Sequence, residues 1–359
     1  MNRLRVVVLY GGRSVEREVS RVSARTIVAA LDRSKYDVVP LAVGEDGAFL
    51  TAGASAKLLA DGKVPAKYLE AETSSGSGAL VPIEIGPGRA DVVFPIIHGT
   101  TGEDGTLQGF LDFLGIPYVG AGVTGSAVGM DKAVFKALLS SARIPTPRSV
   151  VVRPSDRGGR ARQMAASLPL PLFIKPATGG SSVGVVKVRD LERLDDALVE
   201  AFRYDDRALI EEGIDARELE CAVLGDEEPR ASLPGEIVPG HEFYDYDDKY
   251  RDDKAKLLIP APVSDAVSEE VRRLAVEAFR LCGLSGMARV DFFLERGTDR
   301  VLVNELNTLP GFTAISMYPK LWEASGLPLP ALLDELIRLA LARKEKRDRL
   351  SRKPPAELA

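Results

Sequence analysis

The sequence predicts a protein that combines α/β with α+β structure: a doubly wound parallel-sheet domain followed by two α+β units. Three observations lead to this prediction. A β-branched run at residues 4–10 precedes a glycine-rich turn and a helical pattern. The pattern then changes at Asp131 to short strands and helices, and a hairpin pattern follows at residues 288–307. A length of 359 residues allows two or three domains, and we expect them at 1–125, 126–217 and 218–359.

The N-terminal unit begins with a strand that is apolar without interruption, which is typical of a parallel strand buried on both faces. A glycine-rich turn leads from it into a helix and a second strand, and this order indicates a doubly wound fold. Strands are expected at residues 4–10, 37–43 and 92–97, and a helix at 16–31. The Gly-, Ala- and Ser-rich residues 51–88 are expected to be irregular.

The two later units mix short strands with helices. Strands are expected at residues 149–152, 172–175, 185–188, 208–212 and 219–224, and helices at 131–141, 191–202 and 264–282. A hairpin is expected over 288–295 and 301–307. The uncharged, glycine-rich residues 113–130 are interpreted as strand plus loop, and the basic residues 338–353 as a solvated helix end and tail.

Composition excludes several classes of protein. A net charge of −5 argues against a nucleic-acid binder. Cys221 and Cys282 are too far apart for a CxxC site, so we interpret both as core residues of a protein in a reducing compartment. With two histidines, an HExxH zinc site is impossible. No segment is long and apolar enough for a membrane span or a signal peptide. We therefore expect a cytoplasmic protein with no membrane partner.

The hairpin carries the strongest geometric prediction. Alternate residues of a strand share a face, and those of the second strand are Val301, Val303, Glu305 and Asn307. A turn near Thr298 places Asp291 opposite Glu305. The same register places Arg289 opposite Asn307. One face of the sheet is thus expected to carry two carboxylates, an amide and a guanidinium.

Two carboxylates this close repel each other unless a cation lies between them. Oxygen ligands of this kind suit Mg²⁺, which favours one or two protein carboxylates together with substrate phosphates. We therefore interpret Asp291 and Glu305 as metal ligands. The alternative is a surface ladder of salt bridges.

A Gly/Ser loop at residues 175–184 is the second chemical feature. Glycines let backbone N–H groups converge on an anion, and the Ser181 and Ser182 hydroxyls add donors. Lys175 can balance phosphate charge, although no Walker A motif is present. The loop alone could be a flexible connector, but together with the hairpin it predicts a nucleoside triphosphate site. GxGxxG is absent from the first glycine-rich turn, which disfavours a dehydrogenase.

Seven segments carry a resemblance to a known family. In order along the chain they are LYGGRSVEREVS (9–20), HGTTGEDGTLQG (98–109), MDK (130–132), KPATGGSSVG (175–184), FYDYDDKY (243–250), ARVD (288–291) and NELNTLPG (304–311). In these segments the sequence resembles the D-alanine–D-alanine ligases of the ATP-grasp superfamily. The likeness covers nearly the whole chain apart from residues 51–88 and the basic tail.

The resemblance implies an ATP-grasp architecture, in which two α+β domains clamp ATP beside the N-terminal domain. It implies that two D-alanines are joined to D-alanyl-D-alanine through an acyl phosphate, for peptidoglycan precursor synthesis. ATP is then a cosubstrate, two Mg²⁺ or Mn²⁺ ions are the cofactors, and the chain forms a homodimer.

The resemblance also assigns the nucleotide and metal contacts. Lys132 and Lys175 are expected at the phosphates, with Ser182 and Lys249 among the other ATP-binding residues. Glu211 is expected at the adenine edge and Glu218 at the ribose hydroxyls. The metal ligands it implies are Asp291, Glu305 and Asn307, which agrees with the face deduced from strand parity.

The remaining assignments concern the amino acid substrates. Glu16 is expected to bind the ammonium of the first D-alanine and to be linked through Ser181 to Tyr250 by hydrogen bonds. His98 is expected beside that substrate. The oxyanion hole is assigned to Arg289 and the Gly311 backbone N–H, and the positioning of the second D-alanine or the transferred phosphate to Lys249 and Ser316. Residues 243–256 are expected to form a lid.

Three alternatives stay open at this stage. A different carboxylate–amine ligase of the ATP-grasp type would share the nucleotide half of the site. A D-lactate-forming ligase would differ mainly at the lid, where the related D-lactate enzymes lack the tyrosine that this chain keeps as Tyr250. A nucleotide-binding module without activity would have lost Arg289 or a metal ligand, and the sequence retains them.

Overall fold

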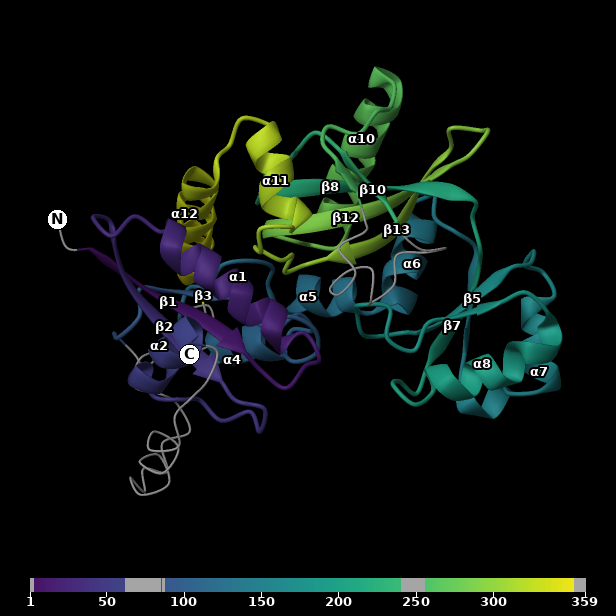
Figure 1. Ribbon diagram of the computed structural model, residues 1–359, viewed down its shortest axis with the longest axis horizontal. Helices are drawn as coiled ribbons and strands as arrows, with labels where there is room; N and C mark the ends of the chain where they lie inside the picture. The colour runs from purple at the N-terminus through teal and green to yellow at the C-terminus, as the bar shows by residue number, and fades with distance from the viewer. Residues whose placement is uncertain (1–2, 62–84, 86–87, 240–255, 352–359) are drawn as a thin grey trace, which may run out of the picture.

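The structure is a computed structural model of the chain, and it describes residues 3–61, 85, 88–239 and 256–351. Three sheets organise the described part (Figure 1). A three-stranded sheet forms the N-terminal unit, a six-stranded sheet lies in the middle of the view, and a four-stranded sheet lies at the far end. Parallel and antiparallel sheets are therefore combined as predicted. The residue boundaries of the three domains stay a prediction.

The N-terminal sheet is parallel throughout, with the order β2-β1-β3. Its elements are β1 (Leu4–Gly11), β2 (Tyr36–Val43), β3 (Val92–Pro95), α1 (Arg17–Ala30), α2 (Ala52–Asp61) and α4 (Thr106–Leu114). Val6 and Val8 of β1 face one apolar core, whereas Val7 and Leu9 face another. Burial on both faces explains why this strand is apolar at every position.

One prediction for this unit is wrong. Residues 52–61 were expected to be irregular, but they form helix α2. Alanine, leucine and lysine are strong helix formers and outweigh the single glycine of this segment. The helix is also fixed from outside, because the Ser55 hydroxyl accepts a hydrogen bond from the Ala42 N–H at 2.9 Å.

The central sheet is antiparallel, with the order β4-β7-β5-β6. Its elements are β4 (Ser149–Val152), β5 (Leu172–Pro176), β6 (Val186–Val188), β7 (Ala208–Glu212), α7 (Gly159–Ala165) and α8 (Leu194–Ala201), with 3₁₀ turns at Pro154–Asp156 and Leu191–Arg193. The expected helix over 191–202 is thus a 3₁₀ turn followed by a shorter α-helix. Both α-helices pack on the sheet around a small core of their own.

The six-stranded sheet runs β11-β10-β8-β12-β13, and β9 pairs with β8. Its strands are β8 (Ala216–Gly225), β9 (Arg230–Ala231), β10 (Gly235–Val238), β11 (Lys256–Leu258), β12 (Gly286–Glu295) and β13 (Val301–Asn307). The helices of this region are α5 (Val123–Met130), α6 (Lys132–Ser141), α10 (Asp265–Leu281), α11 (Met317–Ala324) and α12 (Leu329–Asp348). The hairpin β12–β13 agrees with the predicted one.

Helix α5 corrects the interpretation of residues 113–130 as strand plus loop. Its glycines are required by close packing rather than by a turn. A Cβ atom at Gly129 would lie 2.5 Å from the Thr308 side chain, and one at Gly125 would lie 2.7 Å from the Leu284 side chain. The helix therefore lies directly against the segment that leaves β13, and it needs glycine to do so.

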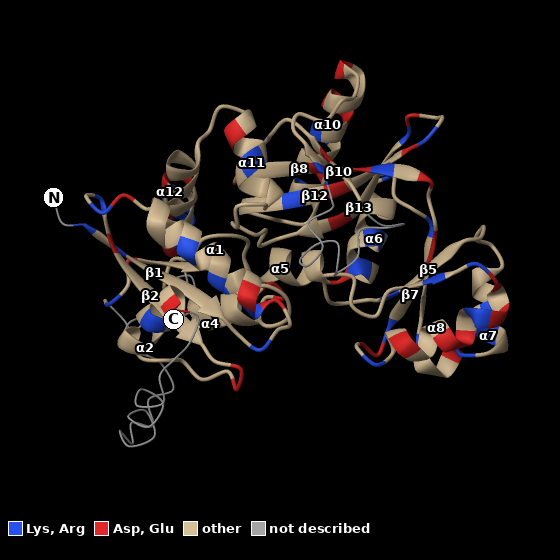
Figure 2. Cartoon of the chain, viewed as in Figure 1, with Lys and Arg blue, Asp and Glu red and all other residues tan. Residues whose placement is uncertain are grey.

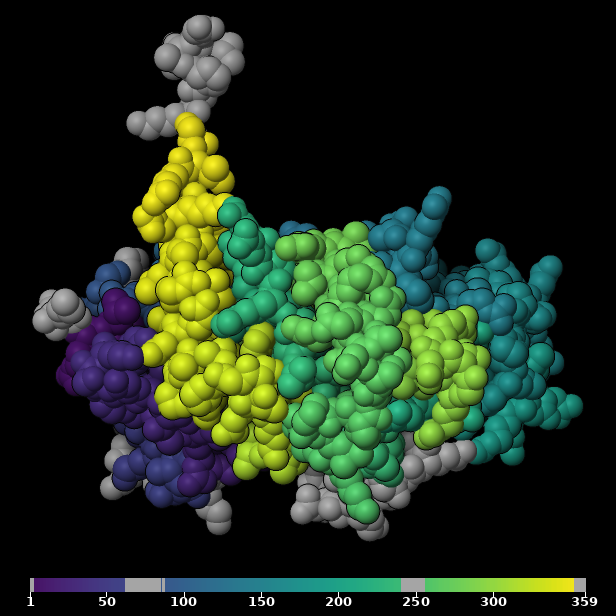
Figure 3. Space-filling model, turned by 90° about the horizontal axis from the view of Figure 1, so that it is seen from above, coloured from purple at the N-terminus to yellow at the C-terminus, as the bar shows by residue number. Residues whose placement is uncertain are grey.

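Helix α12 confirms the expectation of a solvated basic end for Arg338, Lys346 and Arg349, which are exposed, but not for Arg343. Arg343 lies over the Tyr118 ring, with its guanidinium carbon 4.4 Å from the ring centroid, and it donates to the Tyr118 and Gly120 carbonyls and to the Ser285 hydroxyl. Arg347 pairs with Asp112. Figure 3 shows α12 (yellow) against both the N-terminal unit and the six-stranded sheet. Arg343 and Arg347 thus join two parts of the molecule.

The two cysteines are buried and free, as predicted. Burial raises the pKa of each thiol to about 12, so neither is suited to act as a nucleophile. Among the helices that the structure describes, none is both long and apolar enough to cross a membrane.

Candidate active site

Two adjoining cavities of about 610 and 840 Å³ form one cleft. The smaller lies between the start of α1 and the six-stranded sheet, and the larger lies between that sheet and the four-stranded one. Residues that line both are Gly180, Ser181, Glu220, Ile237, Arg289 and Glu305. The hairpin and the Gly/Ser loop, singled out separately in the sequence, therefore face the same space.

The cleft brings together the predicted site residues that the structure describes. The smaller cavity is lined by Glu16, His98, Ser181, Arg289, Glu305, Asn307, Gly311 and Ser316. The larger is lined by Lys132, Lys175, Ser182, Glu211, Glu218 and Asp291. Lys249, Tyr250 and the expected lid over residues 243–256 fall outside the described residues, except for the lid's last residue, Lys256, which begins β11.

Three carboxylates lie in one row across the six-stranded sheet. Asp291 on β12 is in register with Glu305 on β13, as the turn at Thr298 predicts. On its other side Asp291 is in register with Glu220 on β8. Arg289 is opposite Asn307, again as predicted. Figure 2 shows acidic and basic positions together on β12 and β13.

The predicted parity of β13 is wrong in its first half. Val301 and Val303 belong to the apolar core, whereas Glu305 and Asn307 line the cleft on the opposite face. A register shift between Asp291 and Phe292 explains the reversal, because Asp291 pairs with Glu305 and Phe292 with Val303. One extra residue in β13 turns the side chains that follow it to the other face. The bulge thus aims the acidic pair at the cleft.

The Arg289 guanidinium pairs with the carboxylates of Asp291 and Glu220. Its Nε and Nη2 donate to the two oxygens of Asp291, each at 2.7 Å, and Nε lies 3.0 Å from Glu220 Oε2. Asn307 Nδ2 donates to the same Asp291 carboxylate at 2.9 Å. Burial lowers the pKa of Arg289, but the charges of Asp291 and Glu220 outweigh burial and raise it well above its usual value. The guanidinium is a fixed cation at the cleft floor.

Glu16 and Ser181 meet across the cleft. The Ser181 hydroxyl donates to Glu16 Oε1 at 2.5 Å, which links the start of α1 to the Gly/Ser loop. The loop residues Ser181 and Ser182 have φ angles of 52° and 58°, a conformation that costs energy for residues other than glycine. The loop is therefore held in a strained conformation in which its serine hydroxyls face the cleft.

His98 and Glu103 are packed behind Glu16. The Leu309 carbonyl can only accept, so His98 Nδ1 donates to it at 3.0 Å and Nε2 is the unprotonated nitrogen of the neutral ring. Burial lowers the pKa of His98, although the charge of Glu16 opposes that shift. Glu103 accepts from the Gly99 and Leu309 N–H groups at 2.6 and 3.2 Å. Burial and the charge of Glu16 raise the pKa of Glu103 to about 8.

The Gly/Ser loop is tied to the start of α6. Lys132, the first residue of α6, donates from its backbone N–H to the Ala177 carbonyl at 2.8 Å and from Nζ to the Gly179 carbonyl at 2.5 Å. The Gly179 N–H in turn contacts Met130 Sδ at 3.4 Å. The lysine predicted to contact phosphate therefore also shapes the loop predicted to cradle it.

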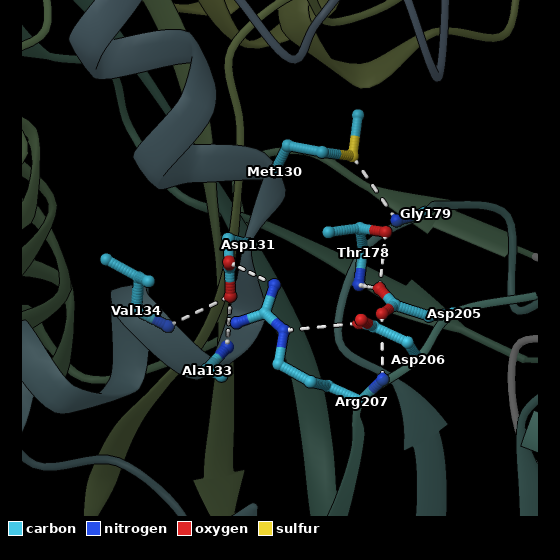
Figure 4. A network of polar contacts seen from close by, with 9 residues as sticks. All are labelled: Met130, Asp131, Ala133, Val134, Thr178, Gly179, Asp205, Asp206 and Arg207. Carbon is cyan, nitrogen blue, oxygen red and sulfur yellow. Dashed lines mark hydrogen bonds and ion pairs between the residues drawn. The ribbon is translucent and has the colours of Figure 1, made fainter. Parts of the chain in front are cut away.

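A second layer of polar contacts supports this junction (Figure 4). Asp131 caps α6 by accepting from the Ala133 and Val134 N–H groups at 3.0 Å. Arg207 donates to the other oxygen of Asp131 at 2.7 Å. Asp205 accepts from the backbone N–H and hydroxyl of Thr178 at 2.7 and 2.6 Å. The base of the loop is thus fixed from both α6 and the turn before β7.

Lys175 is the last residue but one of strand β5 and pairs with Glu211. Lys175 Nζ lies 2.6 Å from Glu211 Oε1, and Lys136 Nζ lies 2.6 Å from Glu211 Oε2. Burial alone would raise the pKa of Glu211, but the two lysines lower it to about 2. Glu211 therefore stays ionised and pairs with two lysines, which are also close enough to Glu305 for its charge to act on them.

Sequence reasoning did not single out Glu103, Glu220 or Lys136. Glu220 could have been found, because it lies two residues after Glu218 in an apolar strand and alternation places both on one face. Glu103 lies in the segment 98–109, where nothing in the sequence indicates that its carboxyl group is buried. Lys136 gave no signal, since a lysine in a helix is usually exposed and here only 5% of its surface is exposed.

Comparison with known proteins identifies the family. The model of the D-Ala D-Ala ligase N-terminus matches residues 5–121, and the model of the D-Ala D-Ala ligase C-terminus matches residues 138–338. The chain belongs to the D-alanine–D-alanine ligase family. A D-alanine–D-alanine ligase of Solibacter usitatus is 45% identical to it over 96% of this chain and 98% of that protein. One of Thermoanaerobacter sp. is 46% identical over 95% of this chain and 97% of that protein.

Solved structures agree with the fold of this ligase. The D-alanine–D-alanine ligase of Coxiella burnetii matches with a TM-score of 0.83 and 40% identity over 97% of both chains. The VanG D-Ala:D-Ser ligase of Enterococcus faecalis matches with a TM-score of 0.82 and 34% identity over 94% of this chain and all of that one. The fold is therefore shared by ligases whose names differ in the second substrate.

Proposed function

We propose that this ligase joins two D-alanine molecules into D-alanyl-D-alanine with ATP as cosubstrate, for peptidoglycan precursor synthesis. Membership of the family makes the chain an ATP-dependent ligase, and the residue roles that follow are our proposals. The observation that carries them is the single cleft in which a Gly/Ser loop, a row of carboxylates and Glu16 face one another.

The larger cavity is proposed to hold ATP. Lys132 and Lys175 lie at the Gly/Ser loop, where their ammonium groups can offset phosphate charge. The proposed ATP contacts are completed by Ser182 in the loop, Glu211 at the adenine edge, Glu218 at the ribose hydroxyls and Lys249 at the phosphates.

The acidic pair is proposed to hold two Mg²⁺ or Mn²⁺ ions together with Asn307. The donor set fits, because Asp291 and Glu305 are in register on one face and offer oxygen ligands. It consists of two carboxylates and an amide. When bound, such ions neutralise charge on the transferring phosphoryl group. In the structure Arg289 and Asn307 occupy the Asp291 oxygens.

The smaller cavity is proposed to hold the amino acids. The Glu16 carboxylate would pair with the ammonium of the first D-alanine, with Ser181 and Tyr250 holding that carboxylate in place. His98 lines the same cavity and is proposed to lie beside that substrate. Lys249 and Ser316 are proposed to position the second D-alanine's carboxylate or the transferred phosphate.

The first step forms an acyl phosphate. A carboxylate oxygen of the first D-alanine bonds to the γ-phosphorus, and the bond from that phosphorus to the bridging oxygen breaks, so that ADP leaves with the electron pair. Two anions must approach for this to occur. Lys175, Lys249 and Arg289 are proposed to offset their repulsion.

In the second step the deprotonated amine of the second D-alanine attacks the acyl carbon. The carbonyl oxygen becomes an oxyanion. Its collapse breaks the bond from the acyl carbon to the phosphate oxygen, so that inorganic phosphate leaves with the electron pair, and the amide nitrogen loses one proton to the phosphate or to solvent. Arg289 and the Gly311 backbone N–H are proposed to donate to that oxyanion. One preorganised donor of this kind is worth about 3–4 kcal/mol of barrier.

The experiment is phosphate release from ATP with chromatographic identification of the product. With D-alanine we expect stoichiometric phosphate and D-alanyl-D-alanine, and with L-alanine neither. Release with D-alanine but no dipeptide would contradict the proposed reaction. Sedimentation of the purified chain tests the proposed homodimer.

The second substrate is the finer part of the proposal, and Tyr250 bears on it. Tyr250→Phe is expected to loosen discrimination against D-lactate, because the D-lactate-forming relatives lack this tyrosine. The measurement compares D-alanine, D-serine and D-lactate as acceptors over a range of pH. Unchanged selectivity in the variant would contradict a role for Tyr250.

A further inference from the structure

A buried lysine lies behind the nucleotide cavity. Lys136 Nζ is 2.6 Å from Glu211 Oε2, and only 6% of the Lys136 side chain is exposed. Its ammonium also donates a hydrogen bond to the Thr146 hydroxyl at 3.1 Å. Lys136 lines neither cavity of the cleft, whereas Lys175 and Glu211 line the larger one. The direct contact of Lys136 with a residue that lines the cleft is its ion pair with Glu211.

The geometry indicates that the two lysines have different roles. We propose that Lys136 is a positioning residue that stays paired with Glu211 and so releases Lys175 to the phosphates of the bound nucleotide. The inference rests on the proposed function, because it uses the assignment of the larger cavity to ATP. It adds a residue behind the site to those assigned within it.

The argument begins with the charge on Glu211. Its carboxylate is 1% exposed and cannot be compensated by water. An ionised group that is buried must keep a counter-ion, since removing one partner of a buried pair is strongly destabilising. Two ammonium groups are present for this one carboxylate, so one of them can leave while the carboxylate stays paired.

The two lysines differ in which of them can leave. Lys175 stands at the end of β5, where the Gly/Ser loop begins, and its side chain is 14% exposed at the edge of the cavity. Lys136 lies one helical turn after Lys132 on α6, facing the core beside Phe135 and Leu139, which are also buried. A rotation about the side-chain bonds takes Lys175 to the cavity. Lys136 is enclosed and remains.

Without Lys136, the nucleotide and Glu211 would compete for Lys175. Binding of the phosphates would then leave a buried carboxylate without a cation. The nucleotide would bind more weakly for a reason that involves only its phosphates. A nucleoside that lacks phosphates makes no demand on Lys175 and would escape this penalty.

The experiment compares AMP-PNP with adenosine. Lys136→Met removes the charge and keeps the length of the side chain. We expect the Kd for AMP-PNP, measured by calorimetry, to rise at least about tenfold. Adenosine, measured by competition, is expected to change by less than about twofold. An equal loss for both ligands, or no loss for either, would overturn the proposal.

A matched control separates this effect from loss of stability. Leu139→Ala creates a cavity on the same helix, so we expect a lower Tm with both affinities unchanged. Lys136→Arg keeps the positive charge and is expected to restore most of the AMP-PNP affinity. Failure of Lys136→Arg to bind better than Lys136→Met would count against a role for the charge.

If Lys136→Met alone does not fold, the same substitution can be tested in the Glu211→Gln variant. Glu211→Gln removes the carboxylate that needs a counter-ion, so the double variant buries no unpaired charge. In that background Lys136→Met is expected to change the Kd for AMP-PNP by less than about twofold. A loss of tenfold or more there would overturn the proposal.

The outcome is distinguishable from that of the proposed reaction, because these measurements use no amino acid. A wild-type chain that binds AMP-PNP with these contrasts but forms no dipeptide would overturn the reaction and leave the role of Lys136 standing. Dipeptide formation without the contrast between AMP-PNP and adenosine would support the reaction and overturn the role of Lys136.

Discussion

Two ion-pair clusters line the same cleft with opposite balances of charge. On the six-stranded sheet, the carboxylates of Glu220, Asp291 and Glu305 surround one guanidinium, that of Arg289. At the four-stranded sheet, two lysine ammonium groups flank the single carboxylate of Glu211. By these direct contacts the first cluster has more acids than bases and the second has more bases than acids, while the charge of Glu305 also acts on both lysines.

The difference shows how the cleft can organise a metal–triphosphate complex. A surplus of carboxylates attracts divalent cations, and a surplus of ammonium groups attracts phosphates. The two clusters share the larger cavity, since Asp291 and Lys175 both line it. A ligand that carries both kinds of charge would be held between them, which fits ATP with its metal ions.

The largest effect is expected from a substitution in the acidic cluster. Glu305→Ala is expected to lower kcat for ATP turnover by about 1,000-fold, because a bound metal contributes several kcal/mol of charge stabilisation. Phosphate release with D-alanine measures the effect, and circular dichroism checks that the fold is intact. Glu295→Gln is the matched control, since Glu295 pairs with Arg300 in the same hairpin and lines neither cavity. Full activity of Glu305→Ala would remove the metal assignment.

The basic cluster is tested by Lys175→Met. Glu211 keeps Lys136 as its partner, so the fold is expected to survive. The Kd for AMP-PNP without metal is expected to rise about 10- to 100-fold, as for the loss of one charge-assisted hydrogen bond of about 1.5–3 kcal/mol. Mn²⁺ binding should be unchanged. Lys35→Met, at an exposed pair with Asp334, is the control. Equal weakening of Mn²⁺ and nucleotide would contradict separate roles for the clusters.

The smallest effect concerns Glu103, a buried carboxyl group whose pKa is raised to about 8 by burial and by the charge of Glu16. The folded chain keeps its proton up to about pH 8, whereas the unfolded chain loses it near the ordinary pKa of 4.5. The unfolded chain thus binds fewer protons in that window, and the free energy of unfolding falls as the pH rises.

Glu103→Gln is expected to remove this contribution, which is at most about 1.4 kcal/mol per pH unit for one proton. Urea unfolding of both chains between pH 5 and pH 8 measures the difference in slope. Equal slopes in the two chains would show that Glu103 is ionised in the folded state.

Much of this architecture could be predicted from local sequence signals. The position of the turn near Thr298 predicts the pairing of Asp291 with Glu305, which the structure confirms. The unbroken apolar run of β1 gave a strand buried on both faces. Both signals arise within one element or its nearest neighbour, so composition and spacing are enough to reveal them.

Features that depend on contacts across the molecule could not be predicted. The glycines of α5 are explained by Thr308 and Leu284, which lie more than a hundred residues away in the chain. The bulge in β13 leaves no mark on alternation, so Val303 was assigned to the wrong face. Lys136 and Arg343 look like exposed basic residues until the partners that bury them are known.

The most direct test of the account is a crystal structure with AMP-PNP and Mn²⁺, in which anomalous scattering locates the metal. We expect two peaks within ligand distance of Asp291, Glu305 and Asn307, with the triphosphate between them and the Gly/Ser loop and with Lys175 Nζ moved from Glu211 to a phosphate. Manganese bound away from these side chains, or a nucleotide outside the larger cavity, would contradict it.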